Sequence, residues 1–232
     1  MCYLLERRNE TLNISVAIDG PAGSGKSTIA NIIAERFKLM YINTGSMYRA
    51  VTLMAMRNNI SFSDIEGICK LTNSLDMHFE NDKLIVNEED VSEEIRFPEV
   101  TNNVSNYAAI PEVREILVKL QQNMAHKYNV IMDGRDIGTV VLKDAPLKFF
   151  LTAGAEERAK RRCKEFKEKG IDTEYNNVLN DILKRDYIDS NRKSNPLCKA
   201  QDAIEIDSSK LSIGEVVEVI SGYVKEYIEK NN

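Results

Sequence analysis

The 232-residue sequence lacks any apolar run that approaches the roughly twenty residues needed by a membrane-spanning helix. Its opening, MCYLLERRNE, has a short apolar stretch that is interrupted at Glu6, too short for a secretory signal peptide. Hydrophobic residues make up 43% and charged residues 29% of the chain, a balance typical of globular rather than disordered or fibrous proteins. We therefore expect a cytoplasmic protein without a membrane partner, long enough to bury a substantial core.

Cysteine and histidine are scarce. The four cysteines lie far apart and include no C-x-x-C pair: Cys2, Cys69, Cys163 and Cys198. This spacing argues against a disulfide framework and against a zinc site, and it indicates reduced thiols. Only two histidines exist, His78 and His126, which argues against catalysis by several imidazoles. We interpret both as surface or packing residues.

Positive charge is not in excess either. The formal net charge is −5, whereas nucleic-acid-binding proteins usually carry a basic surplus. One basic cluster, RAKRRCKEFKEK, runs from Arg158 to Lys169, but it contains a single aromatic residue, Phe166. Because single-strand binding surfaces combine basic with stacking aromatic side chains, nucleic acid is a disfavoured partner. One alternative function for this chain is nevertheless kept open. It is a nucleotide-dependent switch or a nucleic-acid-binding ATPase that uses this cluster as its contact surface.

Short apolar runs alternate with helical patterns along the chain. Runs at 14–19, 39–43, 129–133, 147–151 and 203–207 predict strands, the second more weakly than the others. Apolar residues with a period near 3.6 predict helices after residue 28, before residue 129 and over 213–228, the last beginning at a capping box of Ser212 and Glu215. Strands alternating with helices are typical of βαβ units, so we predict an α/β fold with a parallel sheet.

One segment interrupts this alternation. Between Met77 and Arg96, short strand-like pieces are separated by polar turns, with a hairpin turn expected at Asn81 and Asp82. The pattern predicts a small antiparallel insertion.

The strongest motif is GPAGSGKS, which fits G-x-x-x-x-G-K-[ST] between a predicted strand and a predicted helix. Glycines let the backbone turn its N–H groups toward phosphate oxygens at the positive end of the helix. Lys26 is expected to reach the terminal phosphates, and the Ser27 hydroxyl is a ligand suited to Mg²⁺. The alternative is a glycine-rich turn that binds nothing, but the motif in this context favours a nucleoside triphosphate. The residues expected to bind this nucleotide are Gly20, Pro21, Ala22, Gly23, Ser24, Gly25, Lys26, Ser27 and Thr28.

A second acidic group is needed near the metal. Asp133 ends a buried apolar strand, and its carboxylate is placed to hold the Mg²⁺ shell. Taken alone, Asp133 is as well explained as a residue that caps a turn. Together with the phosphate loop, the metal role of Asp133 and Ser27 becomes the better interpretation.

Several arginines follow the predicted strands. Transfer of a phosphoryl group between two anions needs positive charge, and arginine grips phosphate through two N–H groups. Arg49 and Arg135 lie where such a site is expected. Arg158 and Arg162 form a pair with no acid between them, which predicts a clamp over the phosphates or, alternatively, an ordinary basic surface. The neighbouring row Glu157, Arg161, Glu165 and Lys169 alternates in sign, as a solvated stripe does.

The stretch KRDYIDSNR places Arg185, Asp189 and Arg192 at spacings of four and seven. In a helix they share one face. Such a row is explained either by a solvated i, i+4 ion pair or by a face turned toward a charged ligand.

Five stretches together resemble bacterial cytidylate kinase: IDGPAGSGKSTIA, NTGSMYRAVT, DGRDIGTVV, KRDYIDSNR and DAIEIDSSKLSIGEVV. They run from about Ile14 to Ile228 in that family's order, and the pair formed by DGRDIGTVV and KRDYIDSNR is far more specific than the phosphate loop. The resemblance implies a P-loop three-layer α/β fold with a five-stranded parallel sheet, within a kinase domain at 14–232 after an N-terminal extension at 1–13. It also implies a monophosphate-binding insertion at about 60–110 and a helical lid at about 154–175.

The resemblance implies transfer of the ATP γ-phosphate to CMP or dCMP, in pyrimidine nucleotide metabolism, by a chain that we expect to be a monomer. Catalysis would rest on Lys26, Arg135, Arg158 and Arg162 with Mg²⁺, acting through position and charge. The implied substrate-binding residues are Arg49, Arg135 and Arg192 for phosphate, Ser105, Arg114 and Asp136 for cytosine, Arg185 and Asp189 for the pentose, and Thr44. The family usually has aspartate where this chain has Asn43, so any role for position 43 is open.

Chemistry independently supports the cytosine set. The exocyclic amine of cytosine needs an acceptor such as the Asp136 carboxylate, and its O2 and N3 need a donor such as the Arg114 guanidinium. Uracil has the opposite polarity at its 4-position and leaves a buried carboxylate unpaired there. The alternative within the same class is a kinase for UMP, dTMP or AMP.

Overall fold

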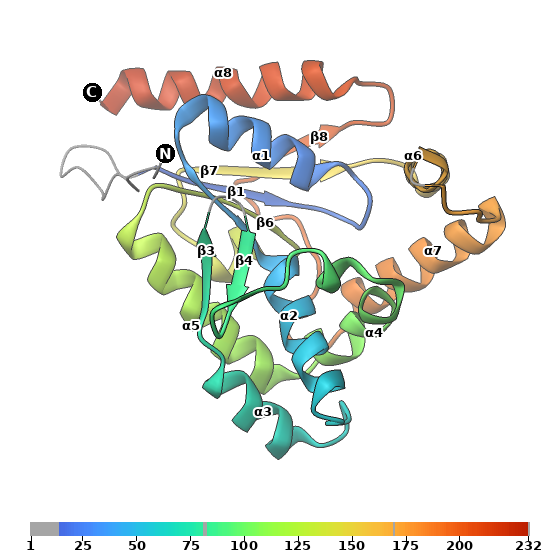
Figure 1. Cartoon of the computed structure of the whole chain (residues 1–232). Helices are drawn as coiled ribbons and strands as arrows, with labels where there is room; N and C mark the ends of the chain where they lie inside the picture. The colour runs from blue at the N-terminus through green and yellow to red at the C-terminus, as the bar shows by residue number, and fades with distance from the viewer. Residues whose placement is uncertain (1–13, 81–82, 169, 232) are drawn as a thin grey trace.

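The computed structural model describes residues 14–80, 83–168 and 170–231 (Figure 1). The extension at 1–13, with Cys2, lies outside the described residues, as do the hairpin turn expected at Asn81 and Asp82 and the end of the charged stripe at Lys169. In the described part no helix is both long and apolar enough to cross a bilayer. Cys69, Cys163 and Cys198 are free thiols, and both histidines are exposed.

The centre of the molecule is a five-stranded sheet with the strand order β2-β6-β1-β7-β8. Every neighbouring pair in this sheet is parallel, which confirms the predicted fold class. Its strands coincide with the five predicted apolar runs: β1 (Ser15–Asp19), β2 (Met40–Asn43), β6 (Val130–Gly134), β7 (Leu147–Thr152) and β8 (Ile204–Asp207).

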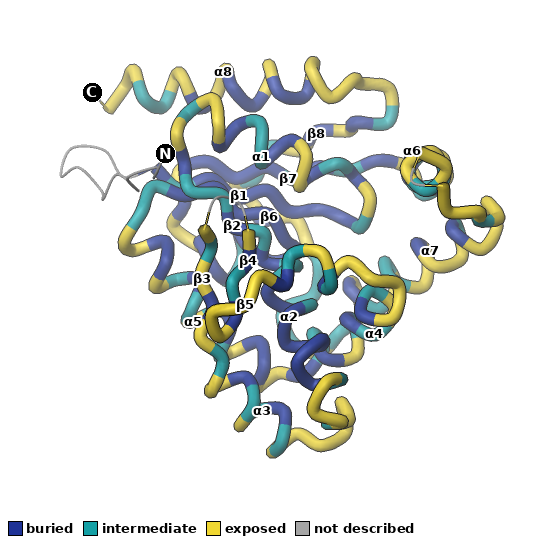
Figure 2. The backbone as a smooth tube through the Cα atoms, viewed as in Figure 1, coloured by how far each residue is buried: buried dark blue, intermediate teal, exposed yellow. Residues whose placement is uncertain are grey.

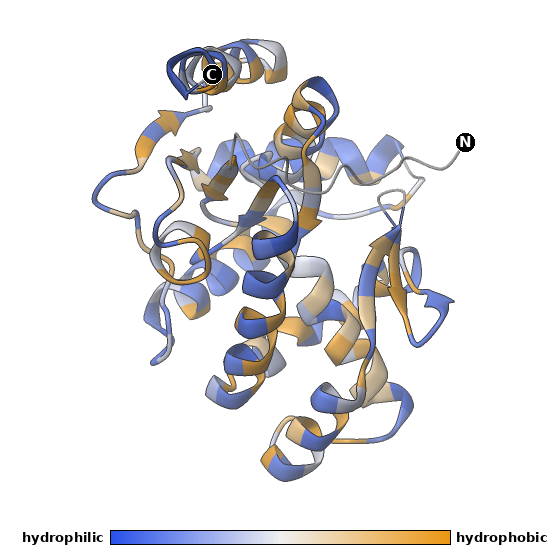
Figure 3. Cartoon of the chain, turned by 90° about the vertical axis from the view of Figure 1, so that its left-hand side faces the viewer, coloured by the Kyte–Doolittle hydropathy of each residue, from blue (hydrophilic) through white to orange (hydrophobic). Residues whose placement is uncertain are grey.

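Alternation along the strands divides the core into two layers. Val16 and Ile18 of β1 pack with α1 (Lys26–Phe37) and α8 (Ile213–Asn231), whereas Ala17 packs on the opposite face with α2 (Thr44–Arg57) and α5 (Pro111–Lys127). Side chains of a strand point alternately to its two faces, so a strand buried on both faces must be apolar throughout. The result is a three-layer fold with a buried sheet in the middle (Figures 1 and 2). Apolar residues concentrate on the sheet and on the helix sides that face it (Figure 3).

The sequence signals at the helix ends explain where these helices begin. Pro111 occupies the first turn of α5, where its missing N–H has no partner to lose. The capping box predicted before α8 is present: the Ser212 N–H donates to Glu215 at 2.8 Å, and the Glu215 N–H donates to the Ser212 hydroxyl at 3.2 Å.

The segment between α2 and α5 contains the predicted antiparallel sheet, of strand order β3-β4-β5. It comprises α3 (Ile65–Ser74), β3 (Met77–Glu80), β4 (Lys83–Val86), β5 (Glu89–Asp90), the short helix η1 (Glu94–Arg96) and α4 (Pro98–Ala108). The turn from β4 to β5 holds Asn87 and Glu88 at φ 48° and 68°. Two successive left-handed residues form the tight hairpin turn whose twist matches that of the strands.

A pair of helices, α6 (Ala155–Glu168) and α7 (Tyr175–Asn191), projects beyond the sheet (Figure 1). It has its own small core, formed by Ala159, Val178 and Ile182. Arg161 donates to Glu157 at 3.2 Å, as the alternating stripe predicts, but Glu165 pairs with Arg162 instead. Polar contacts, described below, join α6 to the phosphate loop and α7 to the turn after β6.

Candidate active site

The phosphate loop connects β1 to α1 at the carboxyl edge of the sheet. Gly20 is packed so closely that a Cβ there would lie 2.0 Å from the carbonyl oxygen of Leu151, and Gly25 has φ 91° where α1 begins. Only glycine fits these two positions without strain. The loop therefore holds the backbone N–H groups of the first turn of α1 at the positive end of the helix.

Lys26 is the basic residue of this loop. Its side chain is 5% exposed, and its ammonium donates to the Pro21 carbonyl at 2.6 Å and to the Ser24 hydroxyl at 3.3 Å. Burial and the nearby Arg135 cation lower its pKa well below the usual value, against the opposing effects of Asp133 and Asp19. A buried cation close to another cation favours an anionic ligand.

A hydroxyl and amide network joins the loop to the neighbouring strands. Ser27 Oγ donates to Asp133 at 2.8 Å, and Tyr41 Oη donates to the other oxygen of the same carboxylate, also at 2.8 Å. Asn43 donates to Tyr41 Oη at 2.9 Å and to Ser27 Oγ at 3.3 Å, while its oxygen accepts from the Ser46 N–H and caps α2. Burial and the Asp133 charge raise the pKa of Tyr41, so its hydroxyl stays a donor. Asn43, where the family usually has aspartate, thus supplies an N–H donor that an aspartate side chain lacks.

Two adjoining cavities open beside this network. The cavity next to the phosphate loop is lined by six of its residues, Ala22, Gly23, Gly25, Lys26, Ser27 and Thr28, and by four arginines, Arg49, Arg135, Arg162 and Arg185. Gly20, Pro21 and Ser24, also predicted to bind ATP, form the base of the loop and do not line it. Asp133, Glu165 and Asp181 are the acidic side chains of its lining. With the Lys26 cation, positive charge exceeds negative charge at this cavity.

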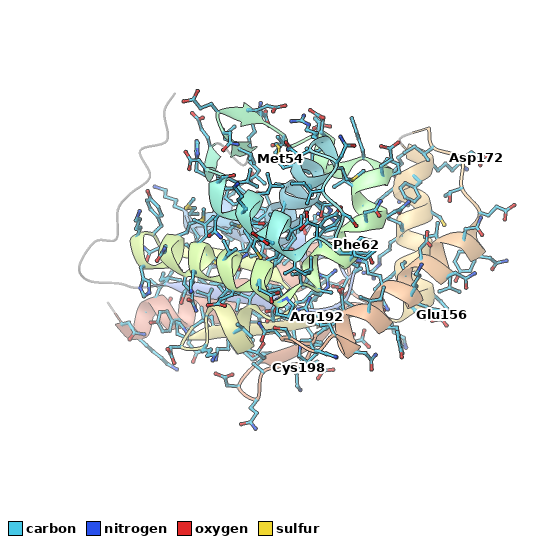
Figure 4. The ribbon with its side chains drawn as sticks, turned by 90° about the horizontal axis from the view of Figure 1, so that it is seen from below. Met54, Phe62, Glu156, Asp172, Arg192 and Cys198 are labelled. Carbon is cyan, nitrogen blue, oxygen red and sulfur yellow. The ribbon has the colours of Figure 1, made fainter. Side chains whose placement is uncertain are left out.

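The second cavity is lined by the remaining predicted substrate residues, Thr44, Ser105, Arg114, Asp136, Arg185, Asp189 and Arg192. They come from α2, α4, α5, α7 and the turn after β6, so the fold brings together residues spread over most of the chain. Figure 4 shows Arg192 near the middle of the molecule, whereas Glu156 and Asp172 of the α6–α7 region lie at its edge. Arg135 and Arg185 line both cavities, which makes the two one continuous site.

Three buried charges meet at the inner end of this second cavity. Arg114 and Arg192 both donate to Asp136, Arg114 to one oxygen and Arg192 to the other at 3.2 Å. Arg114 also donates to the Ala108 carbonyl at 3.1 Å and lies 5.2 Å from the centre of the Tyr48 ring. Burial and the Arg114 charge lower the pKa of Arg192. One carboxylate thus compensates two cations and fixes their orientation.

The row of Arg185, Asp189 and Arg192 does face one cavity, but it is not one helical face. Helix α7 ends at Asn191, and Arg192 is its extended C-cap with φ −65° and ψ 145°. Asp189 accepts from Arg135 at 2.7 Å, so its ion pair joins α7 to the turn after β6 rather than closing within the helix. Although burial opposes it, Arg135 and Arg185 hold the pKa of Asp189 below its usual value. Tertiary contacts therefore favour the ligand-facing interpretation.

Arg49 and Arg185 are cations held close to other cations. Burial and Arg135 lower the pKa of Arg49 to about 10 and that of Arg185 to about 9. The Nε–H of each is buried and has no hydrogen-bond partner in the described structure. Such unsatisfied cationic donors are expected where an anion binds.

The expectation of an unneutralised Arg158–Arg162 pair is wrong, because each arginine has an acidic partner. Arg158 is 5% exposed and donates to Asp186 of α7 at 2.6 Å, to the Ala22 carbonyl of the phosphate loop at 2.9 Å and to the Ala153 carbonyl at 2.9 Å. Its guanidinium lines neither cavity. Arg158 thus connects α6, α7 and the phosphate loop through three protein contacts.

Arg162 is placed differently. It lines the phosphate-loop cavity, donates to Glu165 at 3.1 Å and stacks on Phe166 at 4.8 Å. The sequence analysis considered ion pairs between residues four positions apart. It therefore missed the pair of Arg162 with Glu165, which are three positions apart. Of the two arginines, only Arg162 is in position to meet a ligand in this cavity.

Among the residues that support this site, the sequence analysis missed Tyr41, Tyr48 and Asp186. Tyr41 precedes Asn43 by two residues on β2 and therefore points to the same side, which is a signal that the strand pattern contains. Tyr48 and Asp186 carry no such signal, because their roles depend on Arg114 and Arg158 of other helices.

The three-layer fold around a parallel sheet, the phosphate-loop motif between β1 and α1 and the two adjoining cavities lined by arginines define a P-loop phosphotransferase fold. The sequence profile of the family described as "Cytidylate kinase" matches residues 16–226. This chain belongs to the cytidylate kinase family.

Relatives of high similarity support this membership. The chain is 64% identical over 217 residues to the "Cytidylate kinase" of Clostridium acetobutylicum, covering 94% of this chain and 100% of the relative. It is 63% identical over 214 residues to the "Cytidylate kinase" of Clostridium botulinum strain Loch Maree, covering 92% and 99%. Among solved structures, an uncharacterized protein from Eubacterium ventriosum shares the fold, with TM-score 0.50, 16% identity and coverage of 91% and 98%.

Proposed function

We propose that this chain transfers the γ-phosphate of ATP to CMP or dCMP, giving ADP and CDP or dCDP. The observation that carries the proposal is the cavity in which Arg114 and Asp136 meet Ser105, directly beside the cavity of the phosphate loop. One cavity offers cations to phosphates, and the other offers the donor and acceptor polarity of cytosine.

The chemistry needs no strong base, since the acceptor phosphate is already an anion. An oxygen of the CMP phosphate attacks the γ-phosphorus of ATP, and the bond to the β–γ bridging oxygen breaks as ADP leaves. Lys26, Arg135 and Arg162 line the place where the charge of the transferring group is concentrated. Their preorganised positive charge stabilises the transition state, and the two adjoining cavities orient the two anions in line.

The donor set beside the phosphate loop fits Mg²⁺. Ser27 and Asp133 provide hard oxygen atoms, already 2.8 Å apart, and Tyr41 and Asn43 hold them in place through hydrogen bonds. Mg²⁺, when bound, neutralises and orients the ATP phosphates. In this proposal Ser27 and Asp133 hold the ion or its water shell.

The acceptor nucleotide is assigned to the second cavity by polarity. Asp136 would accept from the cytosine amine, while Arg114 and Ser105 would donate to its acceptor atoms. Asp189 and Arg185 line this cavity and suit the pentose hydroxyls, Thr44 lines it as well, and Arg49 lines the adjoining cavity proposed for the phosphates. The resemblance places Arg192 at the phosphate, but its contact with Asp136 supports a role next to the base.

Arg158 holds α6 and α7 to the phosphate loop in this proposal, rather than contacting phosphate itself. Changing Asp186 to Asn is expected to lower the free energy of unfolding by about 2 kcal/mol, less than a fully buried pair would cost because the Asp186 side chain is 22% exposed. It should also raise KM for ATP, since the Ala22 segment loses its support. Urea denaturation and initial rates measure both effects.

Glu226→Gln is the matched control for this change. It removes the exposed Lys230–Glu226 pair on α8, which is remote from the loop and contributes little to stability. Equal stability and equal KM for ATP in Asp186→Asn and Glu226→Gln would rule out the connecting role of Arg158.

The function itself is tested by a coupled ADP-release assay with ATP and Mg²⁺ across CMP, dCMP, UMP, dTMP, AMP and GMP. We expect kcat/KM for CMP and dCMP to exceed that for the other nucleotides by on the order of 10²-fold or more, since a mismatched base leaves buried polar groups unpaired. A maximum on another monophosphate would keep the phosphotransfer and refute the cytosine site. No turnover with ATP still bound would favour the nucleotide-dependent switch.

A further inference from the structure

A short π-helical turn, η2 (Ile137–Val141), follows β6 and begins directly after Asp136. The first N–H groups of any helix lack partners within it. Asp136 is the N-cap residue of this turn, yet its side chain makes no capping bond because it faces Arg114 and Arg192. Another group must therefore satisfy the first N–H groups of the turn.

That group is Asp19, the last residue of β1. Its two carboxylate oxygens accept from the N–H groups of Ile137 at 2.8 Å and Gly138 at 2.7 Å. The sheet explains this contact, since β1 and β6 are parallel neighbours in which Asp19 lies opposite Gly134. The chain leaving β6 thus passes directly over the carboxyl end of β1.

The contact is buried and closely packed. Asp19 is 4% exposed, and burial raises its pKa to about 6 although the two N–H groups act in the opposite direction. A Cβ on Gly138 would lie 3.2 Å from Lys148 Cδ and 3.4 Å from Asp19 Oδ2, so a side chain at this position would press against Lys148 and lie in contact with the carboxylate. A buried charge whose oxygens are both used for backbone N–H groups is suited to fixing geometry.

Asp19 also immediately precedes Gly20, the first residue of the phosphate loop. We propose that Asp19 is a positioning residue that sets Asp136 at a fixed place relative to the phosphate loop, and thereby aligns the cytosine site with the ATP site. This inference rests on the proposed function, because it assigns a specificity role to the geometry of that same site.

The test replaces Asp19 with Asn. The amide keeps the shape but offers one acceptor oxygen, so its NH₂ group meets one of the two N–H donors. We expect KM for CMP to rise and the ratio of kcat/KM for CMP to that for UMP to fall about tenfold, while KM for ATP changes much less. Gly138→Ala, which displaces the same turn while Asp19 stays intact, should give the same signature.

Ser221→Ala is the matched control. Ser221 lies on α8, on the face of the sheet opposite to the π-helical turn, and its buried hydroxyl accepts from Arg36 at 2.9 Å. This substitution should cost stability and leave the CMP-to-UMP ratio unchanged. If Asp19→Asn lowers kcat/KM for CMP and UMP by one common factor, Asp19 is only structural and the proposal is overturned. If Asp19→Asn does not fold, Gly138→Ala decides by the same ratio. Failure of the proposed function is distinct, because the unchanged protein would then show no CMP preference.

Discussion

Replacing Lys26 with alanine is expected to lower kcat on the order of 10²- to 10³-fold, the cost of removing one preorganised donor from the charge that develops in the transition state. The fold should persist, because the Lys26 ammonium is a buried cation whose pKa is already lowered by burial. Its contacts with Pro21 and Ser24 are local to the loop. Steady-state kinetics with CMP, together with thermal melting, measure both effects.

The matched control is Lys225→Ala, on the exposed side of α8. It removes the same charge from the chain while leaving the phosphate loop intact, so its kcat should equal that of the unchanged protein. An unaltered kcat in the Lys26→Ala variant would refute the assignment of the phosphate loop to catalysis.

Asp136→Ala is expected to have the second large effect, on the choice of base. The CMP-to-UMP ratio of kcat/KM should fall on the order of 10²-fold, because the acceptor for the cytosine amine is lost. KM for ATP should change little. The change also leaves the Arg114 and Arg192 cations without their shared carboxylate, at a cost of about 3–5 kcal/mol of unfolding free energy.

Asp136→Asn keeps the test informative if the alanine variant unfolds. An amide keeps an acceptor oxygen and adds an NH₂ donor that suits O4 of uracil, so the use of UMP relative to CMP should rise. The control is Asp202→Asn, which alters an aspartate that pairs with Lys148 at 2.7 Å and is 63% exposed, outside both cavities. Equal losses on every base in Asp136→Asn would remove Asp136 from the base-reading role.

The elements of the fold could be predicted where local pattern and tertiary packing agree. Strands β1 and β6 are buried on both faces, so their continuous apolar runs were sufficient evidence. The capping box at Ser212 marked the start of α8 because capping is a local interaction. The π-helical turn at Ile137–Val141 was not predicted, because it is stabilised by Asp19, a residue far away in the sequence.

The charged residues likewise divide into contacts that the sequence predicts and contacts that only the tertiary structure reveals. The spacing of KRDYIDSNR indicated that Arg185 and Asp189 point in one direction, but not that Asp189 would pair with Arg135, which directly follows β6. Helical periodicity also placed Arg158 and Arg162 side by side, yet Arg158 contacts the phosphate loop and Asp186 whereas Arg162 faces the cavity. Charge partners four residues apart are readable from sequence, and partners on other elements are not.

The resemblance to the cytidylate kinase family indicated most of the charged residues that line the two cavities, whereas the sequence by itself determined the phosphate loop, the parallel α/β sheet and the antiparallel insertion. These depend on periodicity and on the conformational demands of glycine, both of which are local. Only the tertiary structure decided which cation each carboxylate compensates, that Asn43 and Tyr41 support Ser27 and Asp133, and that Asp19 caps the turn after Asp136. The physical reason is that an ion pair or hydrogen bond depends on distance in space, which the order of the parallel strands sets.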